Sequence, residues 1–272
     1  MKNGGLITKT INTPTTSSAS GVWSLQEQYE AETNDAWPKA LDPNVSTDPY
    51  FSDVTLLLKF EGANNGTTFT DSSNNNCTIT PRSTTTNTSI FKFGTSSGYF
   101  SVNSSYLSVS SASSGVSDFG TGDFTAEMFV YRTTSGRDIF YDTRQSSQTT
   151  GHFTLSTPTS GSNLQVVING VAYATTNSIP TNQWSHIAAT RENGTVRGFV
   201  DGVLGVTSTN NTVSITDGTN GTYPPMIGAT GNGWGSSSSN NHNGYIDELR
   251  ITKGVARYTS TFTPPTAGFL TS

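Results

Sequence analysis

Short runs in which every second residue is apolar recur along the chain from about residue 51 onward. The clearest examples are 124–131 and 164–168, and the runs 53–60 and 245–252 are also rich in β-branched and aromatic residues. A period of two places alternate side chains on the same face of an extended strand. These runs therefore predict β-strands, with the small polar residues in loops and on the solvent-facing positions of the strands.

Tight turns are predicted between several of these runs by Asn169-Gly170, Asn193-Gly194 and Asp201-Gly202. Such dipeptides accept the positive φ angles of type I′ hairpin turns. The stretch 184–206 contains two of them, so it predicts three consecutive antiparallel strands. A dozen or so short strands without intervening helices predict an all-β fold of two packed antiparallel sheets.

Residues 1–50 differ in character from the rest of the chain. The sequence Ser24-Leu25-Gln26-Glu27 fits a helix capping box, and a short helix starting there would end before Trp37-Pro38. A short helix is marginal in water by itself, so its large side chains need a surface to bury against. We expect 1–50 to be an arm for attachment or oligomerisation and 51–272 to be a β-sandwich domain. The attachment residues would be Trp23, Leu25, Tyr29 and Trp37.

Composition narrows the class of protein further. Only 12% of the 272 residues are charged, and 14 Lys and Arg face 19 Asp and Glu without a basic cluster, so we expect no nucleic-acid binding. No run approaches the roughly 18 apolar residues of a membrane span, so we expect no membrane insertion. Disorder is the alternative for so polar a chain, but 14 Phe, 10 Tyr and 4 Trp in periodic runs favour a folded one. The single cysteine, Cys77, allows no internal disulfide.

Four segments together resemble laminin-G/concanavalin A-like domains. They are 57–62 with 71–74, which resemble the family's opening strand and loop, then 183–203, and finally 244–251, which resembles its closing strand. The segment 183–203 contains a Trp and a His-Ile-Ala-Ala-Thr-Arg strand that leads into a Val-Asp-Gly hairpin. The resemblance covers about 51–270 in the right order. It implies a jelly-roll sandwich of two antiparallel sheets.

A narrower resemblance concerns the setting of the protein. The segment 251–265 is similar to the end of such domains in tailed-phage virion proteins, and 21–38 resembles a segment of phage structural proteins, especially those of marine and cyanobacterial phages. This resemblance implies a structural or decoration protein on the surface of a virion, in the capsid, tail or fibre. We expect a multi-copy or oligomeric protein bound to other virion proteins through residues 1–50. The alternative is a dedicated receptor-binding adhesin with a specific sugar site.

Catalysis is the third hypothesis, because concanavalin A-like folds include glucanases. The resemblance implies that a glucanase of this fold would carry the motif Glu-x-Asp-x-(x)-Glu on one strand. That motif is absent from this sequence. The acidic pair Asp247-Glu248 is adjacent in sequence, and adjacent strand residues point to opposite faces of a sheet. Since two carboxyl groups must flank one glycosidic bond, we expect no catalytic residues and no enzyme.

One structural calcium ion is the cofactor that the family resemblance implies, between the loop after the opening strand and the closing strand. The matching positions are Glu61, Asp71, Asn74 and Asp247. Calcium takes oxygen ligands of this kind. The alternative is that Asp71 and Asn74 serve turn geometry and that Asp247 is solvated at the surface.

Two places are candidates for contact with host surface polysaccharide. The loop 231–243 carries Trp234, which could stack on a sugar, with Asn232 and His242 beside it; the alternative is that Trp234 packs beneath the loop. The second candidate is Tyr141 with Asp142 and Arg144. Lectin sites combine an aromatic surface with a few placed polar groups. His186 lies in the family's strand pattern, and we expect it to be a packed structural residue.

Overall fold

The computed structural model describes residues 47–101, 105–110, 115–144, 151–217, 224–230 and 241–272. The predicted helix of the arm, with Trp23, Leu25, Tyr29 and Trp37, lies outside the described residues. Fifteen strands and one short 3-10 helix (Phe51–Asp53) make up the regular structure of the described part. No helix in it is long and apolar enough to cross a membrane.

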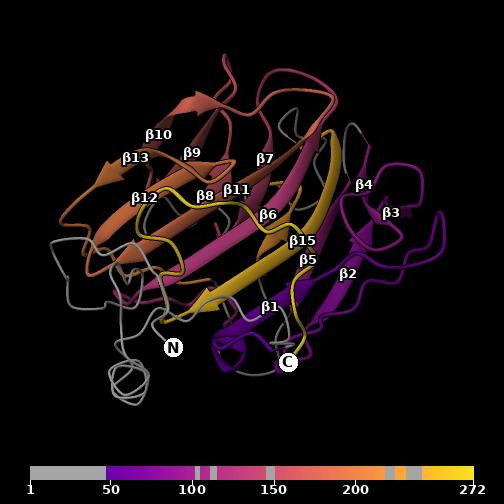
Figure 1. Cartoon of the computed structure of the whole chain (residues 1–272), viewed down its shortest axis with the longest axis horizontal. Helices are drawn as coiled ribbons and strands as arrows, with labels where there is room; N and C mark the ends of the chain where they lie inside the picture. Colours follow the sequence, from indigo (N-terminus) through magenta and orange to yellow (C-terminus); the bar gives the residue numbers. More distant parts are fainter. Residues whose placement is uncertain (1–46, 102–104, 111–114, 145–150, 218–223, 231–240) are drawn as a thin grey trace, which may run out of the picture. The chain divides into compact units, whose positions relative to one another are not determined.

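One layer of the molecule is an eight-stranded antiparallel sheet with the order β13-β12-β11-β6-β15-β4-β3, in which β1 also pairs with β15 (Figure 1). Its strands are β1 (Val54–Leu58), β3 (Thr84–Asn87), β4 (Ser97–Phe100), β6 (Phe124–Arg132), β11 (Trp184–Glu192), β12 (Thr195–Val200), β13 (Val203–Ser208) and β15 (Gly244–Lys253). The long central strands β6, β11 and β15 place residues far apart in sequence side by side.

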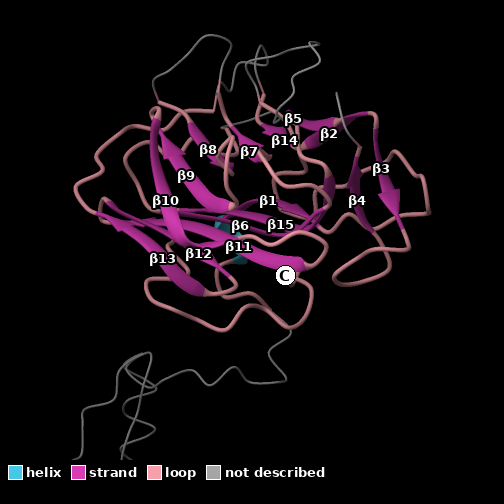
Figure 2. Cartoon of the chain, turned by 90° about the horizontal axis from the view of Figure 1, so that it is seen from above, coloured by secondary structure: helices cyan, strands magenta, loops and turns pink. Residues whose placement is uncertain are grey.

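The other layer is a seven-stranded antiparallel sheet with the order β10-β9-β8-β7-β14-β5-β2. Its strands are β2 (Thr78–Arg82), β5 (Tyr106–Ser110), β7 (Ile139–Asp142), β8 (Phe153–Ser156), β9 (Asn163–Ile168), β10 (Val171–Ser178) and β14 (Met226–Ile227). Figure 2 shows the two sheets as stacked layers, with one apolar core formed by residues of both. The predicted all-β jelly-roll sandwich is confirmed.

The predicted hairpins also form. Both central residues of each turn have positive φ: 53° and 80° at Asn169-Gly170, 47° and 74° at Asn193-Gly194, and 49° and 75° at Asp201-Gly202. At Gly202 a side chain would also collide with the backbone, because a Cβ atom there would lie 2.0 Å from the carbonyl oxygen of Phe262. The turn sequence thus serves both the hairpin and the packing of the chain's last segment.

That last segment, residues 254–272, crosses the outer face of the eight-stranded sheet, and we call it the C-terminal strap (Figures 1 and 2). The rings of Tyr258 and Phe262 stack 3.6 Å apart, and both pack edge-on against His186 of β11. The strap buries positions that the alternating pattern had predicted to face solvent: Thr125 and Glu127 of β6 are 0% exposed. His186 is a packed residue, as expected.

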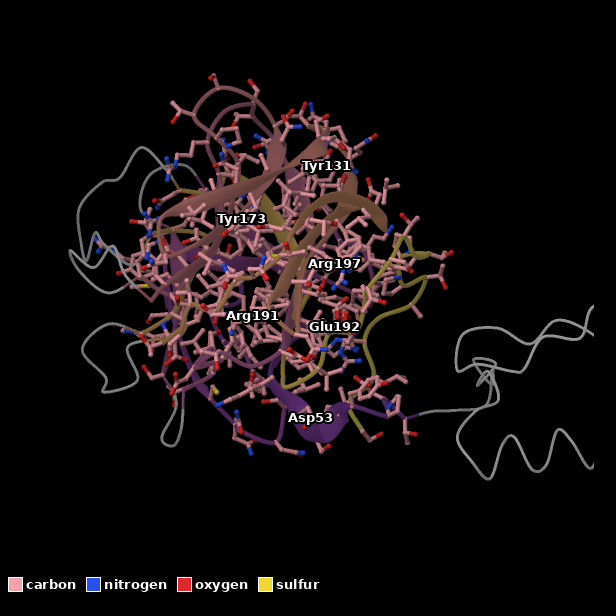
Figure 3. The ribbon with its side chains drawn as sticks, turned by 90° about the vertical axis from the view of Figure 1, so that its left-hand side faces the viewer. Asp53, Tyr131, Tyr173, Arg191, Glu192 and Arg197 are labelled. Carbon is pink, nitrogen blue, oxygen red and sulfur yellow. The ribbon has the colours of Figure 1, made fainter. Side chains whose placement is uncertain are left out.

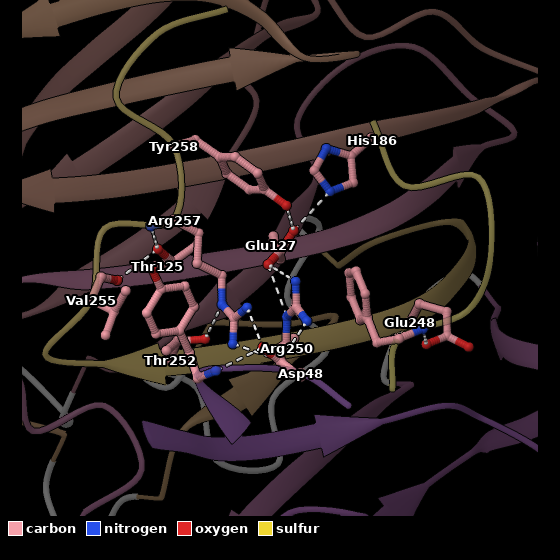
Figure 4. Close-up of polar contacts among 12 residues, drawn as sticks. Asp48, Thr125, Glu127, His186, Glu248, Arg250, Thr252, Val255, Arg257 and Tyr258 are labelled. Carbon is pink, nitrogen blue, oxygen red and sulfur yellow. Dashed lines mark hydrogen bonds and ion pairs between the residues drawn. The ribbon is translucent and has the colours of Figure 1, made fainter. Parts of the chain in front are cut away.

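Glu127 is the centre of a buried polar network beneath the strap (Figure 4). Its Oε1 accepts hydrogen bonds from Arg250 Nε at 2.9 Å and Nη2 at 2.7 Å. Its Oε2 accepts one from the Tyr258 hydroxyl at 2.8 Å, and His186 Nε2 lies 3.1 Å away. Burial alone would raise the pKa of Glu127, but Arg250 and the contact with His186 outweigh it and hold that pKa well below its usual range.

Asp48 extends this network to the beginning of the sandwich. Its carboxylate accepts hydrogen bonds from Arg250 Nη1 at 2.9 Å and from both terminal nitrogens of Arg257, at 2.9 and 2.8 Å. Its backbone N–H donates to the carbonyl oxygen of Ser272 at 2.6 Å. One acidic residue therefore ties the first residues of the sandwich to β15, to the strap and to the end of the chain.

The network predicts a large difference between two Glu→Gln substitutions on neighbouring strands. Glu127→Gln removes the negative charge but leaves Arg250 buried, so we expect the free energy of unfolding to fall by about 3–5 kcal/mol. Glu192 lies at the surface, 38% exposed and 3.2 Å from Arg197, so Glu192→Gln should cost less than about 1 kcal/mol. Denaturant unfolding measures both.

The pH dependence of this difference follows from the lowered pKa. The stabilisation from ionised Glu127 is present above the ordinary glutamate value of 4.5 and is lost as the pH falls below it. The free energies of unfolding of the wild-type protein and of Glu127→Gln should therefore become more alike in acid. Equal costs for Glu127→Gln and Glu192→Gln at neutral pH would contradict the structural role assigned to Glu127.

Candidate functional site

Four aromatic side chains form a continuous row on the outer face of the eight-stranded sheet, and we call them the aromatic row. Tyr245 of β15 lies directly opposite Tyr99 of β4 on one side and Tyr131 of β6 on the other, and Tyr131 lies opposite Trp184 of β11. Direct cross-strand neighbours share a face of the sheet. Each strand of the series β4, β15, β6 and β11 therefore contributes one ring.

Neighbouring rings of the row contact one another, in one tilted pair and two edge-to-face pairs. The centroid of Tyr245 is 5.0 Å from that of Tyr99, with the planes 33° apart, and 5.7 Å from that of Tyr131, with the planes 85° apart. Tyr131 and Trp184 are 5.7 Å apart at 67°. All four side chains are half-buried, so each keeps part of its ring accessible. Burial, followed by the neighbouring Tyr99 and Tyr131, raises the pKa of Tyr245.

Among the described residues, no hydrogen bond engages the hydroxyls of Tyr99, Tyr131 and Tyr245 or the indole N–H of Trp184. Buried Tyr and Trp normally find a partner for these groups, and they are enriched where an apolar body meets a wet edge. Figure 3 places Tyr131 toward the end of the molecule away from Asp53.

Neutral polar residues continue the same surface beyond the row. Asn243 and Thr133 each stand two positions from a ring of the row, and the Thr133 hydroxyl donates to the Asn243 carbonyl at 2.9 Å. The Asn243 side-chain amide lies 3.4 Å from the Thr134 hydroxyl. Thr85 of β3 lies opposite Tyr99. The row is thus bordered by amides and hydroxyls, which can donate and accept hydrogen bonds.

The sequence analysis did not identify the aromatic row. Its members are separated by up to 146 positions, and they meet only because of the strand register that pairs β4, β15, β6 and β11. The available signal was that each ring occupies an outward position of a predicted strand. That signal becomes a site only when the strand order is known.

The prediction that Tyr141 and His242 contact a sugar at the surface is wrong, because both side chains are buried. The ring of Tyr141 is 0% exposed and lies in the core, where its hydroxyl is 2.5 Å from that of Ser117; burial raises its pKa strongly. His242 is also 0% exposed, with Nδ1 3.0 Å from Asp138. A bulge in β7 pairs Tyr141 with Leu155, and both side chains lie in the core. Trp234 and Asn232 lie outside the described residues.

Asp142 and Arg144, by contrast, do lie together. Arg144 donates to both carboxylate oxygens of Asp142, with Nη2 2.6 Å from Oδ2, and the Thr154 hydroxyl donates to Oδ1 at 3.1 Å. His152 is near this pair, and burial, followed by the charge of Arg144, lowers its pKa. Asp142 is fully buried, and its carboxylate is occupied by these donors. The pair is a small ion-paired cluster.

The three carboxylates predicted to bind calcium accept hydrogen bonds from protein groups. Asp71 is buried, and it accepts four hydrogen bonds, from the backbone of Leu57, Ser73 and Cys77 and from the Ser73 hydroxyl. Glu61 accepts from Thr95, and Asn74 is exposed. Asp247 accepts from the backbone N–H groups of Lys92 and Phe93 at 2.8 and 3.1 Å. In the described part of the chain, no three His, Cys, Asp or Glu side chains are grouped closely enough to hold a metal ion.

The prediction that Asp247 and Glu248 point to opposite faces is wrong. A β-bulge shifts the register of β15 between Asp247 and Arg250, and Glu248 has a φ of 50°. Asp247 pairs across from Phe129 on the outer face, and Glu248 accepts from the Phe269 N–H of the strap at 2.8 Å. Both carboxylates thus lie on the outer side, at most 1% exposed. Burial raises the pKa of Asp247 to about 7.

Comparison with known proteins identifies the family of the fold. The Laminin_G_3 family model, described as the concanavalin A-like lectin/glucanases superfamily, matches residues 101–257. No curated protein matches the chain.

Two solved structures have the same fold. One is domain 4 of AbnA, a GH43 extracellular arabinanase from Geobacillus stearothermophilus in complex with arabinotriose, at 20% identity and a TM-score of 0.51, covering 74% of this chain and 93% of that one. Another is the binding domain of botulinum neurotoxin DC in complex with rat synaptotagmin II, at 12% identity and a TM-score of 0.54, covering 76% of this chain and 50% of that one. The chain therefore spans nearly all of the arabinanase domain and half of the toxin structure.

The hydrogen bonds of Asp71 give a test of the calcium hypothesis. Asp71→Asn replaces an acceptor oxygen by an amide group that faces N–H and O–H donors, so we expect the free energy of unfolding to fall by about 1–3 kcal/mol. Because all four partners belong to the protein, the loss should be the same in calcium and in chelator. Asn74→Ala, at an exposed position, is the matched control and should have little effect. A loss seen only with calcium present would instead identify Asp71 as a metal ligand.

Proposed function

The chain belongs to the concanavalin A-like lectin/glucanases superfamily, and from this premise we propose that it is a non-enzymatic carbohydrate-binding protein that holds glycans on the aromatic row. The observation that carries the proposal is the alignment of four half-buried rings, from Tyr99 through Tyr245 and Tyr131 to Trp184, whose polar tips bind no other described residue. Aromatic faces stack on the apolar faces of sugars, and neighbouring hydroxyls and amides bind sugar hydroxyls.

The position of the row supports the same proposal. The C-terminal strap covers Glu127 and His186, whereas the rings of the row keep part of their surface accessible. The arabinanase domain that shares this fold is described with arabinotriose bound, which is consistent with a glycan as the ligand here.

The state of the acidic residues supports a binding role without catalysis. A glycosidase needs two accessible carboxyl groups on either side of the bond to be cleaved. Asp247 and Glu248 share the outer side of the sheet, but both are buried and both accept backbone hydrogen bonds. Glu127 is surrounded by four donor groups. We therefore propose that the carboxylates of this face hold the strap and the loop at Lys92.

We further propose that the module is carried on a phage particle, as a structural or decoration component anchored by residues 1–50. The sequence resemblance of 21–38 and 251–265 to phage virion proteins supports this setting. The tether would leave the sandwich at Asp48, and binding of a host surface glycan would then be the function of the displayed domain.

Removing a central ring of the row should weaken glycan binding. We expect Tyr245→Ala to lower affinity at least about tenfold, because an aromatic side chain contributes about 1.5–3 kcal/mol on burial and each 1.4 kcal/mol is tenfold. A glycan array with the full-length protein would select the ligand, and calorimetry would measure the affinity. The control is Tyr106→Ala, which removes a half-buried tyrosine from β5 of the other sheet. Equal binding by both variants would place the sugar elsewhere, and a silent array would contradict the proposed function.

The anchoring proposal has its own test. Deleting residues 1–47, which keeps Asp48 and its buried network in the sandwich, should prevent the protein from joining particles while leaving glycan binding intact. Incorporation of the truncated protein at full occupancy would contradict the role of the arm.

A further inference from the structure

The direction of the aromatic row restricts the shape of the ligand. Successive strands lie about 4.8 Å apart, so one ring per strand makes a row that runs across the strands. The three centroid spacings of 5.0, 5.7 and 5.7 Å follow this strand spacing. A linear oligosaccharide likewise presents its rings at regular intervals along one axis. The row is therefore suited to several consecutive sugar units.

In the described part of the chain, strand pairing places no large side chain beyond either end of the row. At one end the next strand, β3, places only the small side chain of Thr85 opposite Tyr99. At the other end β12 pairs with β11 only from Ile187 onward, so no β12 residue lies opposite Trp184. A glycan chain can thus continue past Tyr99 or past Trp184. A site for a terminal sugar would need a wall at one end.

The surface of the row is uncharged. Thr85 and the four rings carry no ionic group, and the residues two positions beyond the rings are Ser101, Thr133, Asn182 and Asn243. The nearest acidic group on β15, Asp247, is buried and accepts two backbone hydrogen bonds. The groups that affect the pKa of Tyr245 are burial and the neighbouring phenols of Tyr99 and Tyr131. A negatively charged sugar would find no cation among the four rings, and Lys92, on the same face, is held over the rings of Phe93 and Phe129 at 5.5 and 5.2 Å.

From these three features we infer that the ligand of the aromatic row is a neutral, linear glycan that lies across β4, β15, β6 and β11 and is contacted along its chain rather than at its end. This inference rests on the proposed carbohydrate-binding function. Tyr245 and Tyr131 contact the central units, and Tyr99 and Trp184 contact the outer ones. The amides and hydroxyls of Asn243 and Thr133 bind sugar hydroxyls along one side.

The test is the dependence of affinity on chain length. The full-length protein is titrated with neutral linear arabino-, xylo- and cello-oligosaccharides of one to six units, and with oligogalacturonides as the acidic series. We expect a neutral series to bind, with affinity that increases up to about four units and then levels off, because four rings of ~4.8 Å spacing are then covered. The oligogalacturonides should bind at least tenfold more weakly.

Variants at the two ends of the row sharpen the test. Trp184→Ala and Tyr99→Ala should each weaken binding of the six-unit ligand about tenfold and leave a two-unit ligand unchanged, while Trp184→Phe should keep most of the affinity. Thermal unfolding checks that each variant is folded. If the variant at one end of the row does not fold, the variant at the other end still tests the inference.

Three results would overturn the inference. Affinity that is already complete with a monosaccharide would indicate a terminal-sugar site, and preference for the oligogalacturonides would indicate an acidic ligand. Either result leaves the proposed function standing, because a sugar is still bound. Failure of every neutral and acidic oligosaccharide to bind would overturn both the inference and the proposed function.

Discussion

Glu127 carries a negative charge away from water, and the arrangement of the outer face depends on how that charge is neutralised. Burying a carboxylate costs several kcal/mol unless it is paired and fully hydrogen-bonded. Arg250, Tyr258 and His186 satisfy it, and Asp48 in turn balances Arg250 and Arg257. Because Tyr258 and Arg257 belong to the strap, the network fixes where the strap lies. A buried ion pair often adds little net stability relative to well-packed apolar residues, whereas removing one partner leaves an uncompensated buried charge.

Fixing the strap divides the outer face into a covered and an accessible part. The strap contacts Glu127, Glu248 and Arg250, and the backbone of Lys92 and Phe93 binds Asp247. The carboxylates of this zone are therefore occupied by protein groups. The same three strands, with β4, keep their aromatic residues half-exposed farther along, at Tyr131, Trp184 and Tyr245. One set of strands thus provides a charged, structural zone and a neutral, aromatic zone. The proposed binding surface is the part of the sheet that the strap leaves accessible.

The sequence predicted the sandwich well because its signals are local: alternation within a strand, and dipeptides such as Asn193-Gly194 that require positive φ. It failed where the outcome depends on distant segments. Nothing near Glu127 indicates that a residue 131 positions later will cover it. The shared side of Asp247 and Glu248 follows from a β-bulge, which shifts the face by one residue. The aromatic row needed the strand order, which no local pattern contains.

The measurement that most directly tests the central claim is the structure of the full-length protein with a bound neutral oligosaccharide chosen from the glycan array. The account predicts sugar rings over Tyr245 and Tyr131, with the chain axis crossing β15 and β6 and the reducing and non-reducing ends directed toward Tyr99 and Trp184 in either order. A sugar bound instead on the seven-stranded sheet, beside Asp142 and Arg144, with the aromatic row bare, would contradict it.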